Sequence, residues 1–119
     1  MNKMIEIGEN ISFEQYDRAL NDQISFTNNI NKLFSKYDII ISPATVGSAP
    51  NRDEKEIDDC SLLWTLSLIP SLSAPLFRCP ELMPFNIHFL SSRWNDFNII
   101  NFVEYLVKKE IIDPKCQIL

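Results

Sequence analysis

A run of three isoleucines that stops at a proline is the feature that most constrains how this chain can fold. Residues 39–41 are all isoleucine and lead into Ser42 and Pro43. Isoleucine favours strands, and proline ends a strand because its nitrogen cannot donate to the hydrogen-bond ladder. The apolar residues are consecutive rather than alternating, which is typical of a strand covered on both faces. The sequence therefore predicts a short strand over residues 38–42 with both faces buried.

Helical periodicity is strongest before this strand. Apolar residues recur every three or four positions from Phe13 to Phe34. Ser12 precedes them and Gln15 follows three residues later, which is a capping-box pattern. A long amphipathic helix over about residues 13–36 is therefore predicted.

The second half of the chain alternates strands and helices. A helix over about residues 60–68, capped by Asp58 or Asp59, is apolar nearly all round, so it should be buried or lie at an interface. The remaining predicted elements are strands at 72–77 and 85–90 and a last helix from Asn95 or Asp96. This order indicates an α/β fold in a single domain, 1–119, with a small mixed sheet of about three strands flanked by helices. These elements leave more apolar surface than 119 residues easily cover, which is compatible with a missing neighbour.

Charge and cysteine content exclude several classes of protein. The net charge is −5 and the pI is near 4.7, so the electrostatic field of the chain opposes nucleic acids and anionic membranes. The three cysteines show no metal-ligand spacing, and their odd number suggests reduced thiols. The N-terminus lacks the apolar core of a signal peptide. We expect a cytoplasmic protein that binds no nucleic acid.

One uncharged stretch, residues 60–77, is long enough to be considered as a membrane span. It contains Pro70 and Pro75 and five hydroxyl side chains, all of which would leave polar groups without partners in lipid. It also lies at the lower limit of length for a span. No membrane span is expected.

No active site is displayed by the residues themselves. His88, the single histidine, lies in the middle of a predicted strand. A partly buried histidine with its hydrogen bonds satisfied is a simpler interpretation than a general base. A pair with Cys79 across a hairpin is geometrically possible but has no motif, and Cys60 and Cys79 are more simply buried small hydrophobes. The acidic residues at 53–59 lack calcium-loop spacing. We expect no catalytic residue, no cofactor and no metal, and the sequence leaves the substrate-binding residues unknown.

Four ordered segments nevertheless resemble a known family. They read YDRAL, LFSKYDIIISPATVGSAP, IPSLSAP and PFNIHFLSSRWND. Over residues 12–110 the chain resembles the C-terminal segment of the amidase signature family, which are serine amidohydrolases that cleave carboxamides. The positions that match the family's C-terminal motifs are Tyr16, Ala19, Tyr37, Asp38, Pro43, Thr45, Ala49, Pro50, Pro70, Pro75, Pro84, Ile87, Phe89, Leu90, Arg93, Trp94 and Asp96.

Departures from the family pattern are as informative as the matches. Family glycines are replaced near positions 68–69 and at Leu82, Asn86 and Ser91, which relaxes close backbone approaches. Gln23 stands where arginine is usual, and His88 stands where glutamine is usual. The Gly-Ser-rich region that carries the family's two catalytic serines, together with its lysine base, has no counterpart here. The serines at 71, 73, 91 and 92 have no lysine at motif spacing.

The resemblance implies a function that needs a second polypeptide. The first hypothesis is a C-terminal fragment or subunit of an amidase-like protein, inactive alone, whose partner is an N-terminal amidase-like polypeptide. In the family the thin loop after residue 43 lies near the body of the enzyme, so its usual neighbour is absent here. The alternative is a free-standing protein-binding module derived from an amidase fold, which pairs with itself or another protein. A small enzyme using Cys79 or His88 is the third hypothesis.

Overall fold

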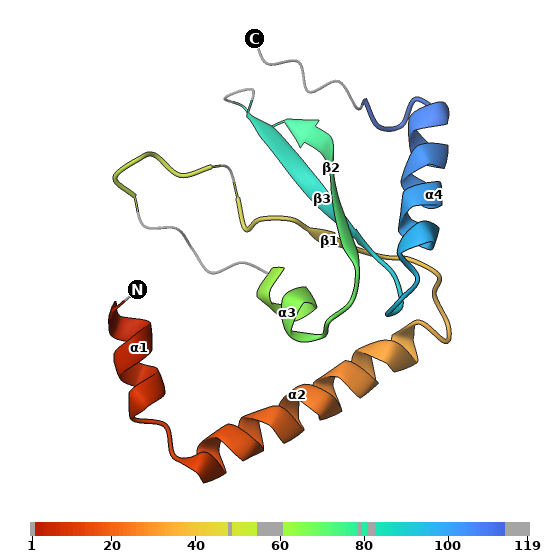
Figure 1. Cartoon of the computed structure of the whole chain (residues 1–119). Helices are drawn as coiled ribbons and strands as arrows, with labels where there is room; N and C mark the ends of the chain where they lie inside the picture. The colour runs from red at the N-terminus through yellow and green to blue at the C-terminus, as the bar shows by residue number, and fades with distance from the viewer. Residues whose placement is uncertain (1, 48, 55–60, 79, 81–82, 114–119) are drawn as a thin grey trace.

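The structure is a computed structural model that describes residues 2–47, 49–54, 61–78, 80 and 83–113. Its elements, shown in Figure 1, are α1 (Asn2–Glu9), α2 (Phe13–Leu33), β1 (Ile40–Pro43), α3 (Ser61–Leu66), β2 (Ser71–Arg78), β3 (Pro84–Leu90) and α4 (Asp96–Lys108). The predicted α/β fold class and every predicted helix and strand are confirmed. Helix α1 was not predicted from the sequence.

The three strands form one sheet in the order β1-β3-β2. Both pairings are antiparallel: Ile41 lies opposite Phe89, and Ala74 lies opposite Ile87 on the other side of β3. The predicted sheet was mixed, whereas each neighbouring pair is antiparallel. Strands β1 and β2 run in the same direction, but β3 separates them, so no parallel ladder forms.

Helix α2 begins with the capping box that its sequence predicts. The Ser12 hydroxyl oxygen accepts a hydrogen bond from the Gln15 backbone N–H at 3.2 Å. In return the Ser12 backbone N–H donates to Gln15 Oε1 at 2.9 Å. The two bonds satisfy donors that the first helical turn would otherwise leave unpaired. The helix ends at Leu33, slightly earlier than predicted.

The core lies between the sheet and α4. Phe89 of β3 meets Phe102 of α4 edge to face, with ring centroids 5.8 Å apart, an arrangement favoured by the ring quadrupoles. Ile99 is the most deeply buried residue of α4. Phe97 and Ile100 lie at helical spacing with Val103 in the sequence, but both are exposed. The buried side of α4 is therefore rotated relative to the apolar pattern of its sequence.

The prediction that the isoleucine strand is covered on both faces is wrong for this chain. Ile41 is 65% exposed, although Ser42 and Ala44 on either side of Pro43 are buried. Helix α4 packs on β2 and β3. Ile39 packs against this core, but Ile41, on the same face at the edge of the sheet, stays exposed.

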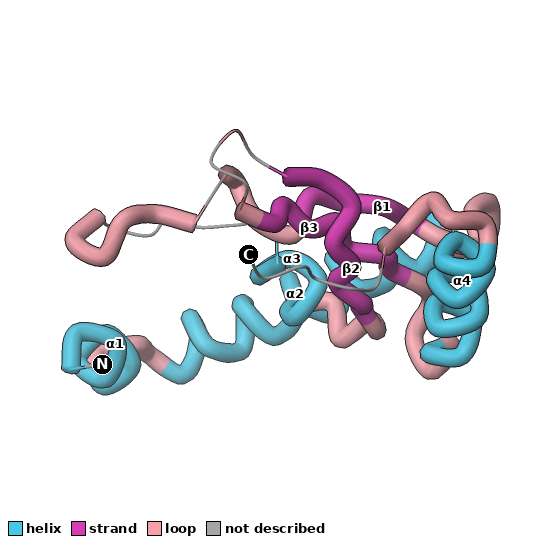
Figure 2. The backbone as a smooth tube through the Cα atoms, turned by 90° about the horizontal axis from the view of Figure 1, so that it is seen from above, coloured by secondary structure: helices cyan, strands magenta, loops and turns pink. Residues whose placement is uncertain are grey.

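The molecule is flat and extended. Its dimensions are 51 × 42 × 16 Å and its radius of gyration is 17.5 Å, whereas a compact domain of this length would have a radius of about 14 Å. Figure 2 shows α1 and the N-terminal part of α2 projecting away from the sheet, on the side opposite α4. No residue of α2 is buried. Phe26, Thr27 and Ile30 are half-buried, whereas Tyr16, Leu20 and Ile24 are exposed, so the apolar side of the long helix is only partly covered.

Helix α4 ends in a Schellman motif that contains an unfavourable residue. The Ile111 N–H donates to Leu106 O at 3.0 Å, and the Glu110 N–H donates to Val107 O at 2.9 Å. Glu110 occupies the left-handed position of this motif with φ of 58°. Glycine is preferred there because a Cβ atom costs about 1–2 kcal/mol in that conformation.

We expect Glu110→Gly to raise the free energy of unfolding by about 0.5–1 kcal/mol, since the relief of strain exceeds the entropy that glycine adds to the unfolded chain. Urea unfolding followed by circular dichroism measures the change. Glu110→Ala is the matched control, because it removes the same charge but keeps the Cβ atom. Equal effects of the two variants would mean that charge at the helix end, not backbone strain, is responsible.

None of the helices in the described part of the chain is long and apolar enough to cross a membrane. The uncharged stretch considered above forms α3, a turn and most of β2. Several residues from the sequence analysis lie outside the described residues: Asp58, Asp59, Leu82 and all three cysteines, Cys60, Cys79 and Cys116.

Candidate functional site

His88 lies at the centre of the sheet, where its neighbours are serines. It is opposite Ser42 of β1 and opposite Ser73 of β2. Its Nδ1 atom is buried and has no hydrogen-bond partner among the described residues, and the same holds for Asn86 Oδ1, two residues earlier on β3. A general base needs an orienting partner on its second nitrogen. The arrangement around His88 provides none in the described part of the chain.

The candidate nucleophilic serines have structural roles or are exposed to solvent. Ser91 is fully buried and its hydroxyl donates to Asn95 O at 2.7 Å, which fixes the turn before α4. Ser71 and Ser73 are exposed on β2. Ser42 and Ser73 lie opposite His88, but no hydrogen bond joins a serine hydroxyl to His88 among the described residues, so no nucleophile–base pair is formed there.

The acidic loop forms a local turn in the part that is described. The Glu54 carboxylate accepts hydrogen bonds from the Asn51 side chain and backbone, each at 3.1 Å. These bonds lower the pKa of Glu54, the side-chain bond being the larger cause. Within the described ranges no group of three or more His, Cys, Asp or Glu residues could hold a metal ion.

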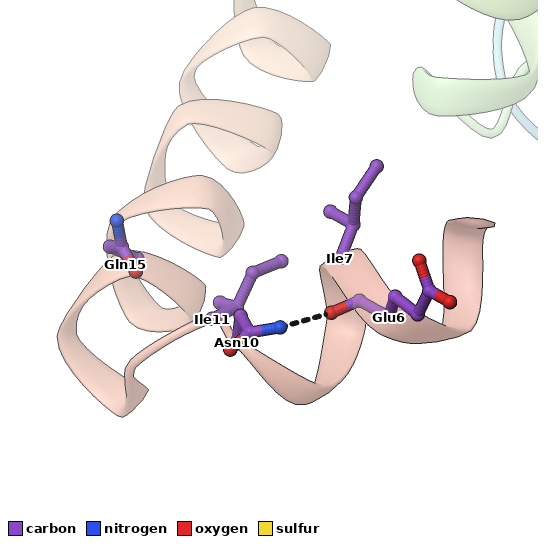
Figure 3. Close-up of a pocket in the computed structure, with 5 residues that line it drawn as sticks. All are labelled: Glu6, Ile7, Asn10, Ile11 and Gln15. Carbon is purple, nitrogen blue, oxygen red and sulfur yellow. Dashed lines mark hydrogen bonds between the residues drawn. The ribbon is translucent and has the colours of Figure 1, made fainter.

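An open pocket at the junction of α1 and α2 is not suited to bind a ligand. Its lining consists of Glu6, Ile7, Asn10, Ile11 and Gln15. Figure 3 shows Asn10 turned back onto the helix, where its side-chain nitrogen donates to Glu6 O at 2.7 Å. Gln15 is used in the capping box. Because the amides are engaged locally, the junction offers a ligand mainly the two isoleucines.

A further feature is an uncovered helical surface, defined here by exposed apolar residues of α2 and α3. Its members are Tyr16, Leu20, Ile24, Leu62, Leu63 and Leu66. Gln23, at the position where the family usually has arginine, links the two helices: its Nε2 atom donates to Leu66 O at 2.9 Å. The sequence predicts that the second helix is either buried or at an interface. Because α3 has no buried residue, the first alternative does not hold in this chain, and the interface stays a prediction.

The total surface shows that the chain is less compact than a typical monomer. The accessible area is 9,670 Å², whereas a compact monomer of this mass would expose about 6,600 Å². The excess, about 3,000 Å², exceeds the roughly 800 Å² that one partner buries in a standard interface. Chemically, such a surface can bind another protein; it cannot by itself catalyse a reaction.

One glycine replacement leaves a strained backbone beside this surface. Leu68 has φ of 55°, in the left-handed region that favours glycine. It lies in the turn between α3 and β2, near positions 68–69, where the resemblance expects a glycine. The side chain of Leu68 is exposed, so the local packing does not explain why leucine is present.

Comparison with known proteins places these features in a larger context. The chain is 26% identical over 101 residues to one subunit of the glutamyl-tRNA(Gln) amidotransferase of Endomicrobium trichonymphae, a match that covers 82% of this chain and 21% of that protein. The corresponding protein of Treponema denticola is 26% identical over 106 residues, with 82% and 22% covered. The chain therefore spans about a fifth of the length of these relatives. No protein-family model matches it.

A solved structure has the same fold. It is described as an unexpected vestigial protein complex that reveals the evolutionary origins of an s-triazine catabolic enzyme. The TM-score is 0.79 at 24% identity, and the match covers 92% of this chain but 27% of the other. A related structure of that complex with an inhibitor bound gives the same values.

Proposed function

From the relationship of this chain to the amidase signature family, we propose that it works as the C-terminal segment or subunit of an amidase-like protein. It has no hydrolytic activity alone and completes the fold of an N-terminal amidase-like polypeptide. The complete assembly hydrolyses a carboxamide. We place it in the cytoplasm, because the odd number of cysteines suggests reduced thiols.

The observation that carries this proposal is α2. It has 21 residues and an apolar side, yet none of its residues is buried. A helix of this kind gains little stability in isolation and normally depends on packing of its apolar face. About four fifths of the length of the matched relatives lies outside the part that this chain covers, which is enough polypeptide to provide that packing.

The first test is to read the DNA that flanks the codon for Met1 in all three frames. We expect it to encode an amidase-like polypeptide with a Gly-Ser-rich stretch and an earlier lysine. That polypeptide would be co-expressed with this chain, and amide hydrolysis by the pair would be compared with hydrolysis by each alone.

Only the pair should hydrolyse amides. If this chain, purified free of other proteins, hydrolysed amides and lost that activity on Ser→Ala substitution, the proposal would be wrong.

A binding module that pairs with itself is the second candidate, favoured by the exposure of α3. It predicts a stable homodimer that buries Leu62, Leu63 and Leu66. Analytical ultracentrifugation of the purified chain, combined with a Leu63→Asp variant, distinguishes this candidate: the module requires a dimer that the substitution dissociates.

A further inference from the structure

The edge of β1 that faces away from β3 pairs with no other described strand, and it has backbone groups available for a further strand. The Ala44 N–H donates to Asn86 O at 3.0 Å. Residues alternate between facing the neighbouring strand and facing away from it. The N–H and C=O of Ile41 and the C=O of Pro43 therefore point away from β3, toward the open edge.

The two edges of the sheet differ in how well they are protected. On β2 the residues that point outward include Pro75, which has no N–H, and the register shifts between Pro75 and Phe77. Prolines and bulges are devices by which edges avoid further pairing. On β1 the residues from 39 to 50 carry no charge, and the outward-pointing Ile41 combines a complete peptide unit with an exposed apolar side chain.

Sequence and structure disagree at Ile41 in a way that points to the same edge. The isoleucine run is typical of a strand covered on both faces, but Ile41 is 65% exposed. Ile41 shares its face of the sheet with Phe89, its cross-strand partner. A strand added beside β1 would bring side chains next to Ile41 on that face and so cover it.

We propose that β1 is extended by an uncharged, apolar strand of the amidase-like partner, which continues the sheet past Ile41. This rests on the proposed function. The partner is preferred to a second copy because relatives carry about four fifths of their length outside the matched part, and because this chain exposes far more area than one added copy of a four-residue strand could cover.

The experiment uses the co-expressed pair and two matched proline variants. Ile41→Pro removes an N–H at the β1 edge. Ser73→Pro removes one at the β2 edge, because Ser91 N donates to Pro70 O and Ser73 therefore also points outward. Ile41→Pro is expected to weaken association at least tenfold, and Ser73→Pro to leave it within about twofold. Ile41→Lys and Ser73→Lys serve as a second pair if a proline variant does not fold.

Hydrogen exchange gives an independent readout. The amide of Ile41 should exchange rapidly in the chain alone and slowly in the pair. A pair that forms with Ile41 still unprotected, and with unchanged affinity in Ile41→Pro, would overturn this inference while leaving the proposed function intact. Failure of the unaltered chains to associate would instead refute the proposed function and the strand addition with it. Protection of Ile41 in a homodimer of this chain would overturn the choice of partner.

Discussion

Replacing Phe89 by alanine is expected to lower the free energy of unfolding of the isolated chain by about 3–5 kcal/mol. Phe89 is 3% exposed and packs edge to face against Phe102. The substitution removes a large buried side chain from a core with few buried members. Native domains are stable by only about 5–15 kcal/mol, so this one change should remove most of the stability of the chain.

Phe97→Ala is the matched control, because Phe97 lies in α4 but is 77% exposed. It should change stability by less than about 0.5 kcal/mol. Urea unfolding monitored by circular dichroism compares the two. If Phe89→Ala fails to fold, Phe89→Leu should still give a measurable loss of about 1 kcal/mol. Similar small losses at both phenylalanines would show that the core is not where the structure locates it.

Local sequence signals were sufficient to predict most of the helices and strands. The capping box of Ser12 and Gln15 fixed the start of α2, and proline at the end of the isoleucine run fixed the end of β1. Helix α1 was not predicted because residues 2–9 carry no helix-capping pattern comparable to that of α2. The pairing of strands needs contacts between distant residues, which explains why the sheet proved antiparallel rather than mixed.

Burial was predicted less well than secondary structure, for a physical reason. The apolar pattern around Ile41 and the apolar stripe of α2 indicate that these residues favour burial. They do not indicate whether this chain provides the residues that would bury them. Ile41 is exposed, and no residue of α2 is fully buried. Under the proposed function, these patterns describe contacts made in the pair, whereas the structure describes this chain alone. The sequence favoured a core histidine with its hydrogen bonds satisfied at position 88, and this is wrong for Nδ1, which is buried without a partner among the described residues.

A charge placed on the uncovered helical surface is expected to affect association with the partner far more than the stability of the chain alone. Ile24 is 59% exposed and belongs to that surface. In the chain alone, Ile24→Asp should change the free energy of unfolding by less than about 0.5 kcal/mol, because an exposed side chain loses little on replacement. In the pair with the amidase-like polypeptide, the same substitution would place an unpaired charge in a desolvated contact. Association should then weaken at least about 30-fold, the equivalent of a hot spot of about 2 kcal/mol.

Asn29→Asp provides the matched control for charge. It adds one negative charge to the opposite side of α2, where Lys32 Nζ already donates to Asn29 Oδ1 at 3.2 Å, and it should leave association within about twofold. Affinity measured by isothermal titration calorimetry and stability measured by urea unfolding separate the two effects. A large loss of stability from Ile24→Asp in the chain alone would mean that α2 packs on its own chain in solution. Unchanged affinity in the pair would mean that the partner binds elsewhere, and that the apolar side of α2 is not the contact that the amidase-like fold requires.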